Sequence, residues 1–258
     1  MVLDGQSAVL SCAVILALAG AGWLVSVMRR DASVVDVLWG LFFILGTLGY
    51  ARHFPMSGRA VLTLALVALW AGRLSGYLLW RNWGAPEDRR YRAMRERHEP
   101  GFAWKSAYLV FGLQAVLAWI LSTPLWVAVA SPAPLSGLDA VGALVWLAGF
   151  VIETVADGQL AGFRRSAATS AVLDRGLWRY TRHPNYFGEA TLWWGYYLIA
   201  VAAGGAWTVF APALMTFLLL RVSGVTLLEA DIRDRRPDYR RYVECTNAFL
   251  PGPRKSAP

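Results

Sequence analysis

The chain has 258 residues, 57% of them hydrophobic, and a formal net charge of +8 at pH 7. Its long apolar stretches indicate a membrane protein, because a hydrocarbon core of ~30 Å needs about 20 apolar residues per helix. Anionic lipid and topology account for the positive charge, and no nucleic-acid-binding motif is present, so we expect no nucleic-acid partner.

Seven apolar stretches predict seven membrane-spanning helices. In chain order they are expected at residues 7–28, 34–50, 60–80, 107–130, 138–156, 187–203 and 207–228. The stretches are too long for strands and lack period-two alternation. Because backbone groups in lipid must satisfy one another, we predict an all-α polytopic membrane protein of about seven transmembrane helices.

Charge placement predicts the orientation of the chain in the membrane. Asp4 precedes the first stretch, and Arg29 and Arg30 follow it, which is the reverse of a secretory signal and predicts a retained anchor with its N-terminus outside. Most of the 25 Lys and Arg residues fall on the other side of a seven-span topology, and only Arg52 and Arg59 fall on the outer side. The positive-inside rule then places the C-terminus in the cytoplasm of, we expect, a bacterial inner membrane.

The densest polar segment, residues 178–189, lies directly before the sixth stretch. It carries two arginines, a histidine, an amide and a carboxylate: Arg179, Arg182, His183, Asn185 and Glu189. Polar groups are costly at membrane depth and mark functional sites, and planar guanidinium groups suit phosphate. A basic belt of snorkelling side chains is the alternative, but such a belt does not need Asn185 and Glu189 one helical turn apart.

Further ionisable side chains lie in or beside the other spans. They include Asp36, Arg73, Glu153, Asp157, Arg221 and Glu229. Interhelical ion pairs, such as Arg73 with Asp36 and Arg221 with Glu189, would explain individual residues. The whole set is explained more economically by a polar cavity that opens to the cytoplasm and holds a charged ligand.

Two basic segments lie between or after the spans. Pro86, Glu87 and Asp88 predict the start of a helix, and a solvated surface helix is the favoured interpretation of the charged residues that follow. Tyr239 and Tyr242 in the basic segment 233–242 favour a folded cap over a plain tail. No metal-ligand spacing occurs among the three histidines and two cysteines, and no Rossmann or P-loop glycine pattern is present.

Several of these segments together resemble the steroid 5-alpha-reductase family. They are residues 153–164, the stretch RHPNYFGE at 182–189 and the segment 227–242. More closely, the chain is similar to bacterial members catalogued as an uncharacterised membrane family, which share the patterns SVVDVLWG at 33–40 and PEDRRY at 86–91. Sterol reductases and isoprenylcysteine carboxyl methyltransferases share the Arg-His-Pro-x-Tyr-x-x-Glu theme.

The resemblance implies one integral membrane domain that binds NADPH from the cytoplasmic side and receives a lipid-like substrate from the bilayer. Residues 1–130 would form the substrate side and residues 138–258 the NADPH side. The residues carried over to NADPH by position are Arg73, Asp157, Arg164, Arg165, Trp178, Arg179, Arg182, His183, Asn185, Tyr186, Glu189, Arg221, Glu229, Tyr239 and Arg240.

In the eukaryotic steroid reductases, a carboxylate of the second span and a tyrosine of the third polarise the steroid ketone. Asp36 matches the carboxylate, but Trp70 occupies the place of the tyrosine and cannot supply a phenolic proton. Enone reduction needs a donor at the oxygen where negative charge develops, and burial favours the neutral, donating form of a carboxyl group. We therefore expect Asp36 to polarise the substrate, aided by Trp39 or Tyr77.

The expected function is NADPH-dependent reduction of an enone double bond in a steroid-like or isoprenoid lipid. The alternative enzyme is a membrane methyltransferase that uses S-adenosylmethionine, and a third class is a transporter or lipid-binding protein. The many arginines favour NADPH, because S-adenosylmethionine carries no phosphate. Transporters often consist of two related halves, and the sequence shows no such internal symmetry. No obligate protein partner is evident from the sequence.

Overall fold

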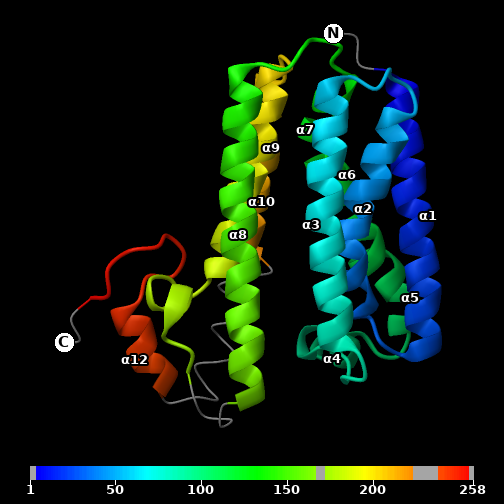
Figure 1. Ribbon diagram of the computed structural model, residues 1–258. Helices are drawn as coiled ribbons and strands as arrows, with labels where there is room; N and C mark the ends of the chain where they lie inside the picture. Colours follow the sequence, from blue (N-terminus) through cyan, green and yellow to red (C-terminus); the bar gives the residue numbers. More distant parts are fainter. Residues whose placement is uncertain (1–3, 167–171, 223–237, 256–258) are drawn as a thin grey trace. The chain divides into compact units, whose positions relative to one another are not determined.

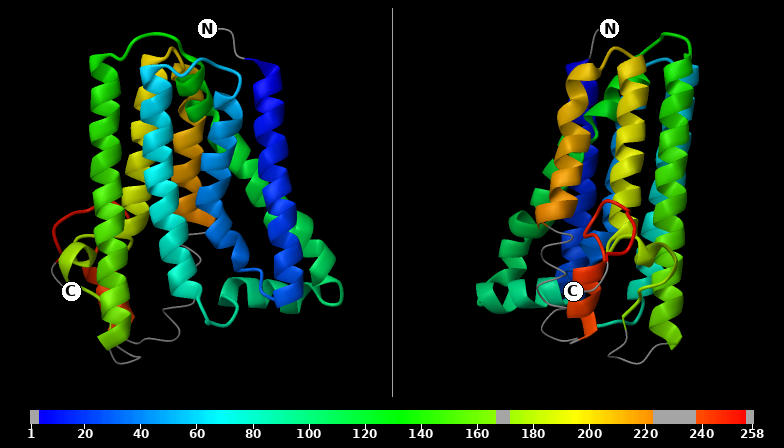
Figure 2. Two further views of the ribbon diagram at one scale, coloured as in Figure 1. Left: turned by 45° about the vertical axis from the view of Figure 1, so that its right-hand side comes forward. Right: turned by 90° about the vertical axis from the view of Figure 1, so that its left-hand side faces the viewer.

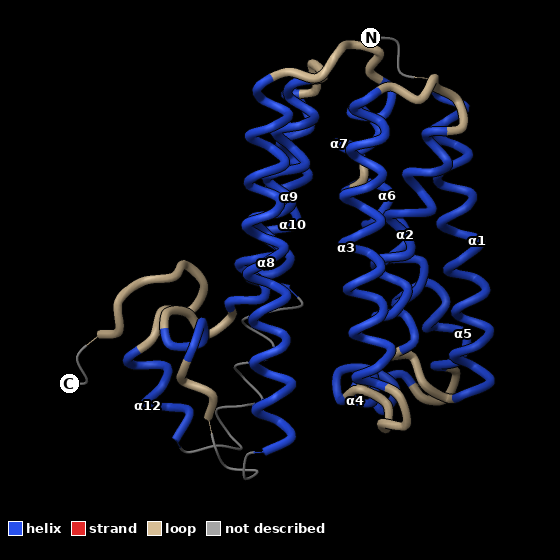
Figure 3. Tube along the Cα trace, viewed as in Figure 1, coloured by secondary structure: helices blue, strands red, loops and turns tan. Residues whose placement is uncertain are grey.

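The structure is a computed structural model that describes residues 4–166, 172–222 and 238–255, all in helices and loops without a strand (Figure 3). The chain divides into two compact units. Unit 1 comprises Met1–Ser136 and Ile199–Thr208, and unit 2 comprises Gly137–Leu198 and Val209–Pro258. The boundary lies near the predicted division between residues 130 and 138, while the prediction of one integral domain stays a prediction.

Unit 1 contains a bundle of long helices in which α2 packs between α1 and α3 (Figure 1). Its elements are α1 (Gly5–Arg29), α2 (Val34–Ala51), α3 (Gly58–Asn82), α4 (Arg89–His98), α5 (Phe102–Ser106), the π-helix η1 (Ala107–Gly112), α6 (Leu113–Leu121) and α7 (Thr123–Ala130). The first three agree with the predicted spans to within two residues at each end. The side chain of Asp4 begins α1 by accepting hydrogen bonds from the amides of Gln6 and Ser7.

The prediction of one unbroken fourth span over residues 107–130 is wrong. Within it, α6 ends at Leu121 and α7 begins at Thr123. Pro124 causes the break, because proline has no amide hydrogen and its ring clashes with the carbonyl of the preceding turn. The hydroxyl of Ser122 lies at the break, where it donates to the carbonyl of Trp119 at 2.7 Å and lies 2.8 Å from the Tyr50 hydroxyl.

Unit 2 is built on two long helices, α8 and α9, with shorter elements around them (Figure 2). Its elements are α8 (Gly137–Ser166), the 3-10 helix η2 (Gly176–Arg179), α9 (Pro184–Ala202, whose last turn belongs to unit 1), α10 (Phe210–Phe217), the π-helix η4 (Leu218–Val222) and α12 (Asp238–Cys245). Instead of ending at Ala156, α8 continues to Ser166. Arg164 and Arg165 therefore lie on the helix itself and not in the segment after it. Residues 223–228 of the predicted seventh span lie outside the described residues.

Glycines bring α8 and α9 into close contact in an antiparallel arrangement. A Cβ atom on Gly149 would lie 2.4 Å from the amide nitrogen of Leu192, and one on Gly188 would lie 2.6 Å from the amide nitrogen of Glu153. Small residues at helix contacts in membranes allow backbones to approach in this way. The contact fixes which residues of the two helices face each other further along.

Five helical segments are long and apolar enough to cross a membrane, by length and composition. They are Gly5–Arg29, Val34–Ala51, Gly58–Asn82, Phe102–Leu121 and Gly137–Arg165. Several expose large apolar side chains, such as Leu69 on α3 and Leu144 on α8, as lipid contact requires. The protein is a polytopic helical membrane protein, and seven spans remain a prediction.

Candidate functional site

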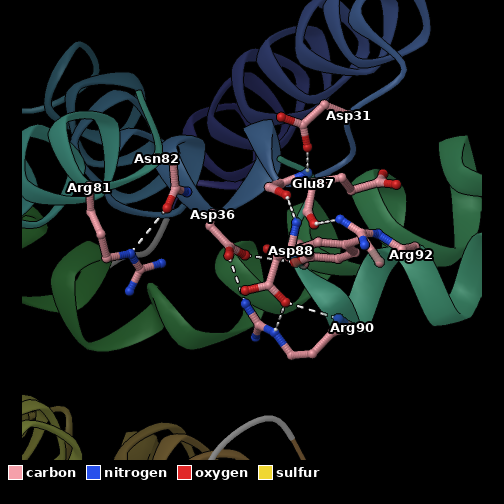
Figure 4. Close-up of polar contacts among 11 residues, drawn as sticks. Asp31, Asp36, Arg81, Asn82, Glu87, Asp88, Arg90 and Arg92 are labelled. Atoms are coloured by element: carbon pink, nitrogen blue, oxygen red, sulfur yellow. Dashed lines mark hydrogen bonds and ion pairs between the residues drawn. The ribbon is translucent and has the colours of Figure 1, made fainter. Parts of the chain in front are cut away.

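Among the described residues, each unit contains a cluster of charged and polar side chains that includes residues singled out from the sequence. In unit 1 they form the Asp36 cluster, defined as Ser33, Asp36, Glu87, Asp88, Arg90, Tyr91 and Arg95 (Figure 4). In unit 2 they form the α8–α9 cluster, defined as Glu153, Asp157, Asn185 and Glu189.

The Asp36 cluster begins with the loop before α4. Asp88 starts the helix, because its carboxylate accepts a hydrogen bond from the amide of Arg90 at 2.9 Å. The Asp88 amide donates to the hydroxyl of Ser33 at 2.8 Å, and the Ala32 amide donates to Glu87 at 2.8 Å. These bonds fasten the loop before α4 to the short connection between α1 and α2. The predicted helix start is therefore confirmed.

Asp36 lies in the first turn of α2 and is held by two neighbouring residues of α4. A guanidinium nitrogen of Arg90 lies 2.8 Å from Oδ2, and the hydroxyl of Tyr91 donates to Oδ1 at 2.6 Å (Figure 4). Arg90 also reaches Asp88 at 3.0 Å. In this arrangement Asp36 acts as an acceptor on both oxygens, and Arg90 takes the place that the sequence suggested for Arg73.

Tyr91 contributes a buried phenolic hydroxyl to this cluster. Its side chain is 6% exposed, and its oxygen also accepts a hydrogen bond from the amide of Gln114 at 3.3 Å. Burial raises the pKa of the Tyr91 hydroxyl well above the usual range, and the charge of Asp36 raises it further. The phenol therefore keeps its proton at neutral pH and acts as a hydrogen-bond donor.

A second ion pair joins Arg95 of α4 to Glu87 in the loop before this helix. Two nitrogens of Arg95 reach the Glu87 carboxylate at 2.8 and 3.0 Å, and its guanidinium lies over the ring of Phe102 at 4.6 Å. Burial raises the pKa of Glu87, but the hydrogen bonds from Arg95 and the Ala32 amide outweigh it, and the pKa lies below the ordinary value. Glu87 is therefore a carboxylate at neutral pH.

The other predicted catalytic residues lie on α2 and α3. The ring of Phe43 stands between those of Trp39 and Trp70, with centroid distances of 5.2 and 5.4 Å. Trp70 is fully buried in this aromatic packing. Tyr77 lies beside Trp80 at 6.0 Å, near the end of α3. The half-buried side chain of Arg73 is one turn along the helix from each of Trp70 and Tyr77.

The α8–α9 cluster results from the glycine contact between its two helices. At the end of this antiparallel contact, the amide nitrogen of Asn185 donates to Oδ1 of Asp157 at 3.2 Å. Glu153, Asp157 and Glu189 are all buried. The structure thus joins Asp157 and Asn185 directly, and Glu153 and Glu189 lie buried one helical turn from them on the same two helices. Among the described residues, no group of three His, Cys, Asp or Glu side chains is arranged to hold a metal ion.

The predicted arginines of unit 2 fall into two groups. Five of them have exposed side chains: Arg164, Arg165, Arg179, Arg221 and Arg240. Arg182 is instead buried, and its guanidinium donates to the carbonyls of Val243 and Thr246 near the end of α12. The exposed guanidinium groups can be reached from solvent, whereas Arg182 links residues 176–183 to the end of α12.

The segment after α12 folds back over residues 176–183. The backbone amide of Arg182 donates to the carbonyl of Asn247 at 2.9 Å, and the Tyr242 hydroxyl donates to the carbonyl of Trp178. The ring of Tyr239 packs against that of Tyr242 at 5.6 Å. The folded cap that these tyrosines predicted is confirmed for residues 238–242, and residues 233–237 lie outside the described residues.

The remaining predicted cofactor residues lie close to this cap. The indole nitrogen of Trp178 donates to the carbonyl of Ala156 on α8 at 3.2 Å. The rings of His183 and Tyr186 stack in parallel, with centroids 5.5 Å apart. Glu229 lies outside the described residues.

The sequence analysis noted the pattern at 86–91 but did not pair Arg90 and Tyr91 with Asp36. A usable signal was present. A single carboxylate in the first turn of an otherwise apolar helix needs a partner, and a cationic residue next to a tyrosine just inside a predicted helix start can supply two donors. The choice of Arg90 over Arg73 depends on the path of the loop, which the apolar pattern does not reveal.

The fold and the two clusters define a polytopic helical membrane protein with buried, hydrogen-bonded charges in each unit. The chain belongs to the family described as a protein of unknown function, DUF1295, whose model matches residues 22–246 and thus both clusters. That family is related to the steroid 5-alpha-reductase superfamily. The chain is also 27% identical over 266 residues to an uncharacterized protein of Schizosaccharomyces pombe, a match that covers 89% of this chain and 75% of the relative. No solved structure matches it significantly.

Proposed function

We propose that this protein is an NADPH-dependent membrane reductase that saturates a carbon–carbon double bond conjugated to a ketone in a steroid-like or isoprenoid lipid. In the proposed orientation its N-terminus is outside and its C-terminus is in the cytoplasm. The observation that carries the proposal is the α8–α9 cluster. Its buried oxygen acceptors belong to the same unit as the exposed arginines Arg164 and Arg165.

The residues of unit 2 fit a dinucleotide chemically. Among the described residues, Oδ1 of Asn185 is buried and has no hydrogen-bond partner, so a ligand hydroxyl or amide group would satisfy it. Carboxylates such as Asp157 suit ribose hydroxyls, and the exposed guanidinium groups of Arg164 and Arg165 suit the pyrophosphate and the 2′-phosphate. NADPH, when bound there, supplies a hydride.

Residues of unit 1 would polarise the substrate ketone. A hydride that adds to the carbon beta to the ketone leaves an enolate, whose oxygen must be stabilised until a proton from water reaches the alpha carbon. The Tyr91 hydroxyl has one hydrogen, which it donates to Asp36 in the structure. In the proposed reaction this hydrogen turns from Asp36 to the enolate oxygen, and Arg90 remains the partner of Asp36. In this proposal Tyr91 supplies the phenolic hydrogen bond that Trp70 cannot, and Asp36 serves as an acceptor and not as the donor expected from the sequence.

Ligand-induced thermal stabilisation tests the cofactor. A ligand that binds only the folded protein raises the thermal midpoint by mass action. We expect NADPH to raise the midpoint of the detergent-purified protein, and Asn185→Ala to abolish that rise. Thr191→Ala on the same helix is the control, since the Thr191 hydroxyl bonds only its own helix, to Phe187. Stabilisation by S-adenosylmethionine alone would replace the reductase with the methyltransferase.

A further inference from the structure

Helix α4 has two sharply different faces. Its buried or half-buried positions are Arg90, Tyr91, Met94, Arg95 and His98, and its exposed positions are Arg89, Arg92, Ala93, Glu96 and Arg97. Each set recurs at the three- and four-residue spacing of one helical face. The outer face therefore carries three arginines and one glutamate.

Carboxylates already satisfy the cations of the inner face. Arg90 reaches Asp36 at 2.8 Å, and Arg95 reaches Glu87 at 2.8 Å. These pairs hold α4 against the rest of unit 1 and leave its orientation fixed. On the outer face, Arg92 also donates to the Glu87 carbonyl at 3.2 Å, and the side chains of Arg89, Arg92 and Arg97 are all exposed to solvent.

Exposed tryptophans lie on the chain segments directly before and after α4. The helix lies across one end of unit 1, between the end of α3 and the start of α5 (Figures 1 and 2). Trp80, Trp83 and Trp104 come from these neighbouring segments and are 51%, 75% and 73% exposed. Tryptophan is enriched at the level of lipid headgroups, because its ring is apolar and its N–H is polar. The tryptophans thus place α4 at the membrane surface.

We propose that the outer face of α4 is a binding site for the headgroups of anionic phospholipids. Guanidinium groups make paired, charge-assisted hydrogen bonds to phosphate oxygens, and an anionic surface attracts basic segments that lie within a Debye length of it. Each arginine near such a surface strengthens binding about fivefold. The site is independent of the dinucleotide and of the reaction proposed above.

The test uses the full-length protein in neutral detergent with phosphatidylglycerol or phosphatidylcholine added. Native mass spectrometry counts the bound lipids, and thermal melting follows the stabilisation. We expect phosphatidylglycerol to bind and to raise the midpoint, and phosphatidylcholine to do neither. The variant R89Q/R92Q/R97Q should weaken phosphatidylglycerol binding on the order of 100-fold. Its side chains are exposed, so the fold should persist.

A second triple variant, R52Q/R240Q/R241Q, removes the same charge from exposed positions outside α4 and should bind phosphatidylglycerol like the unaltered protein. The single variant Arg97→Gln should weaken binding by about fivefold, which keeps the test informative if the triple variant is unstable. Equal loss in both triple variants would reduce the effect to net charge and overturn the site. Equal stabilisation by inorganic phosphate or by phosphatidylcholine would also overturn it.

Discussion

Asp157 and Asn185 come from different helices of unit 2, and the side-chain amide of Asn185 donates to the Asp157 carboxylate at 3.2 Å. The two side chains reach each other because Gly149 and Gly188 allow α8 and α9 to pack closely. A side chain at Gly149 or Gly188 would separate the helices and with them the two polar groups. Packing and the candidate cofactor site therefore depend on the same contact.

Gly149→Ala should destabilise the protein by about 1–3 kcal/mol, because the added methyl group would overlap the backbone of α9. Thermal melting in detergent measures the effect. Gly158→Ala is the matched control on the same helix, where a Cβ atom meets nothing within 4 Å. The control should be neutral or more stable by about 0.5–1 kcal/mol, because alanine favours a helix over glycine. Equal melting of the two variants would contradict the close contact.

Arg164 and Arg182 should respond differently to substitution although both are predicted cofactor residues. Arg164→Gln should weaken NADPH binding by about tenfold or more and leave the melting of the free protein unchanged, since its side chain is exposed. Arg182→Gln should lower the melting midpoint of the free protein, because it leaves the carbonyls near the end of α12 without their donor.

NADPH titration monitored by fluorescence and thermal melting without ligand separate these two effects. The comparison has a built-in control, since both variants lose one positive charge from unit 2. A lower midpoint for Arg164→Gln, or an unchanged one for Arg182→Gln, would reverse the assignment of the two arginines.

Glu87 should make stability depend on pH. Its folded pKa lies below the ordinary value of 4.5, so the unfolded chain binds the proton more readily than the folded one. The stabilisation is therefore fully present above pH 4.5 and is lost as the pH falls through the lower, folded pKa. We expect Glu87→Gln to melt below the unaltered protein at pH 7, and the gap between them to narrow below pH 4.5. A gap that is constant from pH 7 to pH 3.5 would refute this linkage.

Arg59 on α3 should be a major stabilising residue of unit 1. It is 1% exposed and donates to the Ser131 hydroxyl at 2.9 Å and to the carbonyls of Ala133 and Pro134 at 3.2 and 2.9 Å. Arg59→Met keeps much of the side-chain volume but leaves these acceptors unpaired, at a cost of about 1–3 kcal/mol for each that stays buried. Thermal melting measures the loss, and the exposed Arg52→Met is the control.

The apolar pattern predicted α1, α2 and α3 well because each is a continuous run bounded by polar residues. It failed at Pro124, since one proline inside a long apolar run leaves the average hydropathy high while it breaks the helix. It also failed at the end of α8, because the pattern follows lipid contact, and the helix continues into polar residues after Ala156.

The candidate site was predicted as a set of residue types and not as a set of contacts. The i, i+4 spacing of Glu153 with Asp157 and of Asn185 with Glu189 placed each pair on one helical face, and the structure brings these faces together. Sequence spacing does not show which partner a charge chooses across a loop. Arg182, in the densest cationic segment, is therefore a structural donor to α12, while Asp36 pairs with a residue 54 positions away.

At 1.5 Å per residue, the 30 residues of α8 measure about 45 Å, well beyond the ~30 Å of hydrocarbon in a bilayer. Val155 is the last large apolar side chain that the described part of this helix exposes, and Arg164 and Arg165 follow it. Asp157 therefore lies on α8 between the apolar part of the helix and its charged end. A lipid-soluble molecule in the bilayer and a charged molecule in water could each approach this part of the helix without leaving its own solvent.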